Sequence, residues 1–83
     1  MYEIVFAKNA EKDFNSLSNE VKARVAHVLE RMSINPYRYT RRLKGRESFR
    51  ARVGDYRVLL KISKKEKRMD ILRVGHRKNV YDW

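Results

Sequence analysis

The stretch that most restricts the fold of this chain is FRARVGDYRVLL, residues 49–60. Two runs of alternating apolar and polar residues flank the pair Gly54-Asp55, and a glycine-containing pair in that position predicts a two-residue β-hairpin loop. This register places Arg52 directly opposite Arg57. Like charges that face each other across two strands destabilise a hairpin, so the arginines indicate a role outside the hairpin itself.

Strand alternation divides the side chains of the hairpin between two faces. In the expected register Val53 also faces Tyr56. The apolar face is expected to join the hydrophobic core, which leaves the arginine-rich face as the working surface. The apolar set comprises Phe49, Ala51, Val53, Tyr56, Val58 and Leu60, and the opposite set comprises Arg50, Arg52 and Arg57.

Positive charge dominates the composition. The 83 residues contain 21 Lys and Arg against 10 Asp and Glu, which gives a formal net charge of +11. The excess follows residue 30, since residues 31–83 hold 17 bases and 5 acids. Clustered cations are typical of proteins that bind polyanions, because neutralised phosphates release counterions. A surface charged only for solubility is the alternative; a membrane surface is disfavoured, because no segment combines a basic face with a broad apolar face.

Length and composition predict a single domain that spans residues 1–83 and contains one modest core. The sequence has no cysteine, which excludes disulfides and thiolate metal sites. No segment is apolar enough for a signal peptide or a membrane span. We therefore expect a soluble protein that acts in the cytoplasm.

The first part of the chain predicts one strand and two helices. Residues 2–6 have the composition of a strand. Asn9 is expected to cap a short helix, and Ser18 is expected to cap a second helix over residues 19–32 that ends before Pro36. The apolar stripes of the two helices comprise Ala10, Phe14 and Leu17, and Val21, Val25, Val28, Leu29 and Met32.

The remainder of the chain predicts mainly strands. The expected segments are a basic, aromatic loop over residues 37–47 with a short strand near Arg42–Lys44, the hairpin over 49–62, a charged turn at 64–67, a strand over 69–74, and a loop or short tail over 75–83. This order predicts an α+β domain: an N-terminal strand, a two-helix hairpin, and a three- to four-stranded antiparallel sheet with the helices on one face.

The sequence offers little for metal or nucleophilic chemistry. His27 and His76 are the only histidines, and neither has carboxylates at ligand spacing, so we expect no metal site. There is no glycine-rich phosphate loop and no serine nucleophile with a basic partner nearby. Glu47 and Asp55 are isolated among arginines, which disfavours paired-carboxylate catalysis.

Basic and aromatic side chains remain, and they suit chemistry on RNA. Metal-independent strand cleavage uses the 2′-hydroxyl of the RNA as nucleophile, so the protein has to orient the phosphate, stabilise its charge and assist proton transfer. The planar arginine fork binds two phosphate oxygens at once, and unpaired bases stack on aromatic rings. Alternatively, Arg50 and Arg52 only protect an exposed sheet face from aggregation. Tyr37 and Tyr39, interleaved with Arg38, Arg41 and Arg42, either form a nucleic-acid contact loop or close the edge of the core.

Two segments carry a resemblance to a known family. RARVGDYRVLL, followed by ILRVGHRKNVYDW, resembles the RelE branch of the RelE/ParE toxin superfamily from bacterial and archaeal toxin–antitoxin systems. The resemblance extends over essentially the whole chain. It implies the RelE-like fold and ribosome-dependent cleavage of messenger RNA in the decoding site, without metal or cofactor, to leave a 2′,3′-cyclic phosphate.

The resemblance also implies roles for individual residues. Arg57 is expected to hold the scissile phosphate, Arg77 to protonate the leaving group or stabilise transition-state charge, and Tyr81 to stack on a messenger base. The RNA-binding set is expected to comprise Arg50, Arg52, Arg46 and Lys44.

This chain departs from the family at residues 50 and 52, where well-studied members carry lysine. Arginine does not release its proton in proteins, so neither residue can act as the base for the 2′-hydroxyl. Histidine titrates near neutrality, which makes His76 the candidate for proton transfer; a hydrogen-bonded turn residue is the alternative.

The family further implies partners. A RelB-like acidic antitoxin is expected to fold around the basic face, and the ribosome with its messenger and ribosomal RNA is the expected target. Two other functions stay open on the sequence. One is a ParE-like toxin that inhibits DNA gyrase, and the other is a homologue that binds RNA or ribosomes without cleaving.

Overall fold

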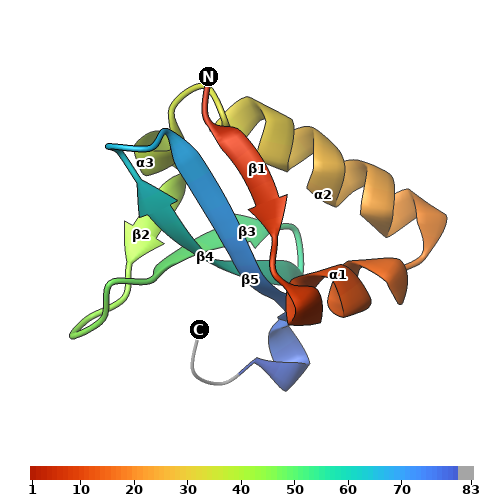
Figure 1. Ribbon diagram of the computed structural model, residues 1–83. Coiled ribbons are helices and arrows are strands. Elements are labelled where there is room, and N and C mark those ends of the chain that lie inside the picture. The colour runs from red at the N-terminus through yellow and green to blue at the C-terminus, as the bar shows by residue number, and fades with distance from the viewer. Residues whose placement is uncertain (81–83) are drawn as a thin grey trace.

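The computed structural model describes residues 1–80 and contains five strands and two longer helices (Figure 1). Along the described chain the elements are β1 (Glu3–Phe6), α1 (Lys8–Asn15), α2 (Asn19–Met32), α3 (Pro36–Tyr39), β2 (Thr40–Arg42), β3 (Phe49–Val53), β4 (Tyr56–Ser63), β5 (Arg68–His76) and the 3-10 helix η1 (Arg77–Asn79).

The five strands form one mixed sheet in the order β1-β5-β4-β3-β2. The predicted α+β class and the order of elements are confirmed. The sheet is larger than the expected three- to four-stranded antiparallel one, because β1 joins it as an edge strand parallel to β5. Helices α1, α2 and α3 and the strands β2, β3 and β4 separate β1 from β5 in the sequence, and parallel strands need such a long connection because a tight turn cannot join them.

The hairpin forms in the predicted register. Val53 pairs with Tyr56, and Arg52 pairs with Arg57. Gly54 has φ of 59°, whereas Asp55 is not among the described residues with positive φ. Positive φ at the first loop residue alone is the pattern of a type II′ turn, which requires glycine first and explains why the order is Gly-Asp.

Helix α2 begins as predicted, whereas α1 begins earlier than predicted. The Ser18 hydroxyl caps α2 by accepting a hydrogen bond from the Val21 N–H at 3.3 Å. The predicted cap at Asn9 is wrong: Ala7 is the N-cap of α1, and Asn9 lies inside the first turn. Ala7 is held at the end of β1 because its N–H donates to the carbonyl of Ile71 at 2.8 Å, so the helix begins directly after the strand.

The segment expected as a loop over 37–47 contains more regular structure than predicted. Pro36 occupies the first position of α3, where its fixed φ favours a helical turn and its missing N–H costs nothing. Strand β2 then runs over Thr40–Arg42, earlier than the strand expected near Arg42–Lys44, because Gly45, with φ of 73°, turns the chain back toward β3. The tail is also more ordered than expected, since β5 continues to His76 and leads into η1.

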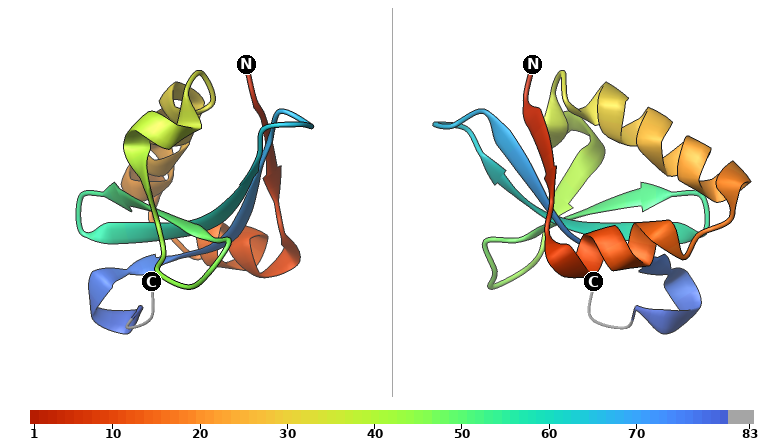
Figure 2. Two further views of the ribbon diagram at one scale, coloured as in Figure 1. Left: turned by 90° about the vertical axis from the view of Figure 1, so that its left-hand side faces the viewer. Right: turned by 45° about the vertical axis from the view of Figure 1, so that its right-hand side comes forward.

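The core lies between the helices and one face of the sheet (Figure 2). The predicted stripe of α2 is confirmed by its three fully buried members, and the apolar face of the hairpin is buried as predicted. Tyr56 is half-buried against this core, in agreement with the structural role expected for it. The buried apolar residues are Ala10, Val25, Leu29, Met32, Ala51, Val53, Val58, Leu60, Met69, Ile71 and Val74.

The side chain of Asp13 in α1 binds the edge of β5 beyond the point where β1 ends. Pairing of β1 with β5 stops at Ile71. The next residues of β5 then bond to the Asp13 carboxylate, which accepts from the Val74 N–H at 2.9 Å and from Arg73 Nε at 2.7 Å. Burial raises the pKa of Asp13, but the bonds from Arg73 and Val74 outweigh it and leave the pKa below its ordinary value.

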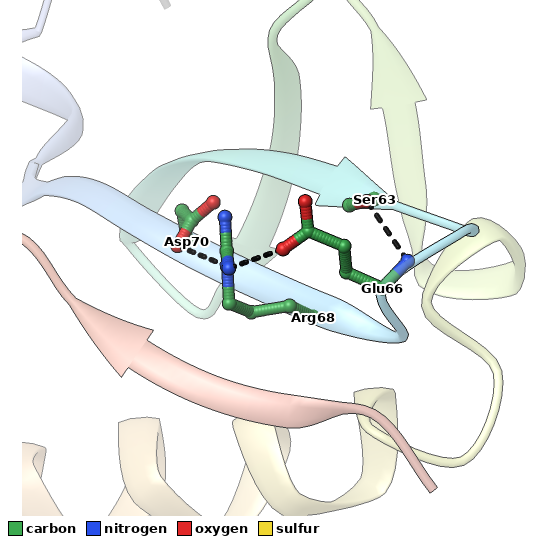
Figure 3. Close-up of polar contacts among 4 residues, drawn as sticks. All are labelled: Ser63, Glu66, Arg68 and Asp70. Carbon is green, nitrogen blue, oxygen red and sulfur yellow. Dashed lines mark hydrogen bonds and ion pairs between the residues drawn. The ribbon is translucent and has the colours of Figure 1, made fainter.

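The other end of β5 is fixed by a second group of carboxylates (Figure 3). Arg68 lies between Glu66 and Asp70 and forms an ion pair with each. The Ser63 hydroxyl accepts a hydrogen bond from the Glu66 N–H at 3.1 Å, which closes the predicted turn at 64–67. No helix among residues 1–80 is long and apolar enough to cross a membrane.

Replacing Asp13 tests its part in holding β5. We expect Asp13→Asn to lower the free energy of unfolding by about 2 kcal/mol at pH 7, because charge-assisted bonds to Arg73 and Val74 are weakened. The pKa of the Asp13 carboxyl is lower in the folded protein than the value of about 3.9 in the unfolded chain. The carboxylate therefore stabilises the fold fully above about pH 3.9, and this stabilisation is lost as the pH falls through the folded pKa. Urea unfolding should therefore show that the free energies of unfolding of the variant and the unaltered protein become equal at acidic pH.

Glu11→Gln is the matched control for this measurement, because Glu11 is an exposed acid on the same helix. If Asp13→Asn and Glu11→Gln lower the free energy of unfolding equally, the effect comes from the loss of a negative charge and not from the bonds of Asp13 to β5.

Candidate nucleic-acid interface

The register of β2, β3 and β4 gathers arginines on one face of the sheet. Arg52 lies opposite Arg57, and Arg50 lies opposite Arg41 of β2. Directly paired residues share a face, and so do residues two apart on a strand, so these four side chains lie on the same side. That side is opposite to the one that packs against the core. The set Arg41, Arg50, Arg52 and Arg57 is called the arginine face below.

Arg57 lies at the centre of the positive charge. It is half-buried, and its Nη1 donates to the carbonyls of Tyr56 at 3.0 Å and Gly54 at 3.3 Å. Burial lowers the pKa of Arg57, and the positive charges of Arg52, Arg50 and Arg77 lower it further, against the opposing effect of Asp55. The electrostatic potential at Arg57 is therefore strongly positive, because the neighbouring arginines repel its charge. A bound anion would relieve that repulsion.

Arg77 joins this cluster through contacts with the hairpin turn. Its N–H donates to the carbonyl of Asp55 at 2.8 Å, and its Nε lies 3.8 Å from Asp55 Oδ1. Both side chains are exposed, so the ion pair itself contributes little to stability. The backbone bond is the more important contact, because it ties the end of β5 to the turn and keeps Arg77 near Arg57.

His76 is half-buried on the other face of the strands, beside Tyr56. The two rings meet edge to face with centroids 5.1 Å apart. The Lys78 N–H donates to His76 Nδ1 at 3.2 Å, so Nε2 is the nitrogen left to exchange a proton with another group. A hollow of about 500 Å³ adjoins this side, lined in part by His76, Asn79 and Val80.

Two other predicted site residues, Lys44 and Arg46, lie away from Arg57. Lys44 and Arg46 lie in the β2–β3 loop, at the opposite end of β3 from the Gly54 turn. Tyr81 lies outside the described residues. His27 is exposed on α2, and among residues 1–80 no three His, Asp or Glu side chains group as metal ligands.

Sequence reasoning did not place Arg41 on the arginine face. Strand β2 is only three residues long, Thr40–Arg42, which is too few for alternation to distinguish a strand from a loop. Only the pairing of Arg41 with Arg50 shows which face it occupies.

The members of the arginine face differ in their acidic neighbours, since Asp55 acts on Arg57. Elsewhere arginines form ion pairs, as in Arg73 with Asp13 and Arg24 with Glu20. Within residues 1–80, Arg41 and Arg52 form no ion pair with an acidic side chain. Arginines that stabilise the fold are thus neutralised by acids, whereas these two are left available for an anion from outside the chain.

The sequence matches the profile of a family described as the ParE toxin of the type II toxin–antitoxin system, parDE, over residues 4–81. No curated protein matches the chain.

Solved structures resemble this one over most of their length. A chain of the toxin–antitoxin complex RelBE2 from Mycobacterium tuberculosis superposes with a TM-score of 0.82 at 31% identity, covering 90% of this chain and 96% of that chain. A chain of the archaeal RelE–RelB complex from Pyrococcus horikoshii has a TM-score of 0.80 at 26% identity, covering 94% of this chain and 97% of that chain. The isolated RelE toxin from Escherichia coli gives 0.81 at 15% identity, with 92% and 84% covered, which is a likeness of fold alone.

Replacing Arg52 tests the repulsion on the arginine face. We expect Arg52→Gln to raise the free energy of unfolding of the isolated protein by about 0.5 kcal/mol at low salt, because it removes the charge opposite Arg57. The gain should shrink as salt screens the remaining charges. Urea unfolding at two salt concentrations measures it, with Arg38→Gln, an exposed arginine on α3, as control. An equal gain in the control would contradict a specific clash between Arg52 and Arg57.

Proposed function

We propose that this chain, which belongs to the RelE/ParE superfamily of type II toxins, is an endoribonuclease that cleaves messenger RNA in the ribosomal A site. The observation that carries the proposal is that Arg50, Arg52 and Arg57 share one face of β3 and β4, while the Arg77 N–H binds the hairpin turn beside them. Such a cluster is suited to a phosphate that gains negative charge during a reaction.

The proposed reaction is metal-independent attack by the RNA's own 2′-hydroxyl. The 2′-oxygen bonds to phosphorus while the bond from phosphorus to the 5′-oxygen breaks, which leaves a 2′,3′-cyclic phosphate and a 5′-hydroxyl. One proton leaves the nucleophile and one reaches the leaving group, so no oxidant or other reactant is needed. The protein contributes by holding the phosphate in line and by stabilising its charge.

Each arginine has a role that its position supports. Arg57 Nη1 is occupied by carbonyls of the turn, so the guanidinium is held in place with Nε and Nη2 available for phosphate oxygens. Arg52, directly opposite, is placed to share that phosphate. Arg77 is proposed to stabilise the leaving oxygen, and Tyr81 is proposed to stack on a messenger base.

Proton transfer is assigned to His76, since the arginines keep their protons. Its Nδ1 accepts a hydrogen bond from the Lys78 N–H, so Nε2 would face the reacting oxygen. His76 lies on the other face of the strands from Arg57. RNA would therefore have to cross the edge of the sheet beside the Gly54 turn to contact both groups.

The ribosome is the proposed source of the remaining walls of the site. The arginine face is an open surface of the described chain, and charge alone does not hold a nucleotide in line for attack. Ribosomal RNA would cover the open side, and further basic residues such as Lys44 and Arg46 would contact it. This need for a covering surface supports cleavage on the ribosome and, with it, action in the cytoplasm.

An acidic antitoxin resembling RelB is the proposed partner in the absence of RNA. The solved relatives from M. tuberculosis and P. horikoshii are complexes of toxin with antitoxin. A partly disordered acidic segment that folds over the arginine face would neutralise it and block RNA at the same time.

The first test is cleavage by the protein and by its Arg77→Ala variant in a cell-free translation reaction with a defined messenger. We expect cuts in phase with codons that require ribosomes. The variant should cut about 100-fold more slowly, because a donor to transition-state charge is lost. Primer extension maps the new RNA ends, and Arg38→Ala serves as a control that keeps the cuts.

Other outcomes of this test select different functions. Translation arrest with intact messenger would replace the nuclease by a protein that blocks ribosomes or RNA without cutting. No arrest at all, with inhibition of DNA supercoiling, would establish a gyrase inhibitor such as the name ParE suggests.

A second prediction concerns His76. We expect His76→Gln to slow cleavage strongly while ribosome binding, measured by cosedimentation, stays unchanged, because the amide cannot exchange a proton near neutral pH. Equal losses of cleavage and binding would contradict a role in proton transfer and leave His76 as a residue of the β5–η1 turn.

A further inference from the structure

The arginine face extends beyond the proposed reaction site to the edge of the sheet at β2. A hollow of about 330 Å³ lies there, lined by Tyr39, Arg41, Arg50 and Arg52. It shares two arginines with the site around Arg57, so the two regions form one continuous basic surface. Neither Tyr39 nor Arg41 has a part in the reaction proposed above.

The fold sorts the basic and aromatic residues near β2 between two faces. Arg42 pairs with Phe49, and its Nε donates to the carbonyl of Arg46 within the β2–β3 loop. Tyr37 also turns toward Phe49, with the rings edge to face at 5.6 Å. Both residues therefore stabilise the loop and the margin of the core, whereas Tyr39 and Arg41 line the hollow on the arginine face.

Tyr39 and Arg41 have the chemistry of a nucleotide contact. Tyr39 is 41% exposed, so part of its ring is accessible to a ligand. Arg41 is exposed and has no acidic partner among residues 1–80. An exposed ring beside the guanidinium group of Arg41 offers a stacking platform for a base together with a fork for its phosphate.

We propose that Tyr39 and Arg41 form a second nucleotide subsite, in which an unpaired RNA base stacks on Tyr39 and its phosphate binds Arg41 and Arg52. The proposal rests on the proposed action on RNA and deepens it. Strands β2 and β4 are two strand spacings apart, about 10 Å, so an RNA strand that fills both sites extends past the nucleotide at Arg57. The subsite thus contacts a nucleotide that neighbours the scissile phosphate.

Binding of short RNA to the isolated protein tests the subsite without relying on cleavage. The probes are fluorescent 2′-O-methyl oligoribonucleotides of one to four nucleotides, which lack the 2′-hydroxyl nucleophile, and fluorescence anisotropy reports affinity. We expect Tyr39→Ala to weaken binding of the longer probes about tenfold and of the single nucleotide little, because one stacked base is lost. Tyr39→Phe should retain binding, since the ring remains.

Arg41 and Arg42 provide a matched pair for the phosphate contact. They are adjacent and exposed and carry the same charge, but they lie on opposite faces of β2. We expect Arg41→Gln to reduce the slope of log affinity against log salt by about 0.7, the value for one phosphate of a single strand. Arg42→Gln should leave the slope unchanged. Circular dichroism melts verify that both variants fold.

Several results would overturn the subsite. These are equal effects of Arg41→Gln and Arg42→Gln, no loss in Tyr39→Ala, or no binding of any probe by the unaltered protein. Displacement of the probe by oligoglutamate, with no effect of Tyr39→Ala, would instead indicate a surface for an acidic peptide.

The same variants separate failure of the subsite from failure of the nuclease. If the unaltered protein does not cut messenger but Tyr39→Ala and Arg41→Gln weaken RNA binding as expected, the nuclease is wrong and the subsite stands. If it cuts normally and both variants bind RNA as the unaltered protein does, the subsite is wrong and the nuclease stands.

Discussion

The register of β3 with β4, which buries one face of the hairpin and pairs Arg52 with Arg57 on the other, is the constraint on which the rest of the structure depends. Two like charges in register cost a few tenths of a kcal/mol to about 1 kcal/mol. The same register buries Val58 and Leu60 on the opposite face, and each buried aliphatic side chain contributes about 1.5–3 kcal/mol. A slip by one residue would relieve the repulsion only by moving arginines into the core. Burial therefore determines the register, and the arginine face is its consequence.

The hairpin alone does not complete the cluster, because Arg77 belongs to the chain after β5. Its position depends on contacts at both sides of that strand. Asp13 supports the edge of β5 after β1 has ended, and the carbonyl of Asp55 binds the Arg77 N–H at the hairpin turn. A helix near the N-terminus and a turn in the middle of the chain thus hold a residue near the C-terminus. Asp13 thus supports the strand that leads to Arg77, whereas the Asp55 carbonyl holds the Arg77 backbone directly.

The sequence predicted local structure better than it predicted which segments meet. The hairpin register and the Ser18 cap were predictable, because each depends on neighbours within a few residues. The parallel place of β1 beside β5 and the pairing of Arg41 with Arg50 were not, since both depend on segments whose alignment no local pattern encodes. The error at Asn9 has a similar origin: a bond from Ala7 to Ile71, a residue 64 positions further along the chain, sets the start of α1.

Arginine in place of lysine at residues 50 and 52 changes what the face can do. Lysine can lose its proton when neighbouring cations lower its pKa, whereas arginine remains charged at any pH near neutrality. The arginine face therefore carries a charge that does not vary with pH near neutrality, and it cannot supply a base. Any change of activity between pH 5 and 8 has to originate in a group outside this face. Within the described chain, His76 lies at the strand ends that carry Arg57, whereas His27 is exposed on α2. The proposed function thus assigns phosphate binding to Arg57 and proton transfer to His76, which lie on opposite faces of the neighbouring strands β4 and β5.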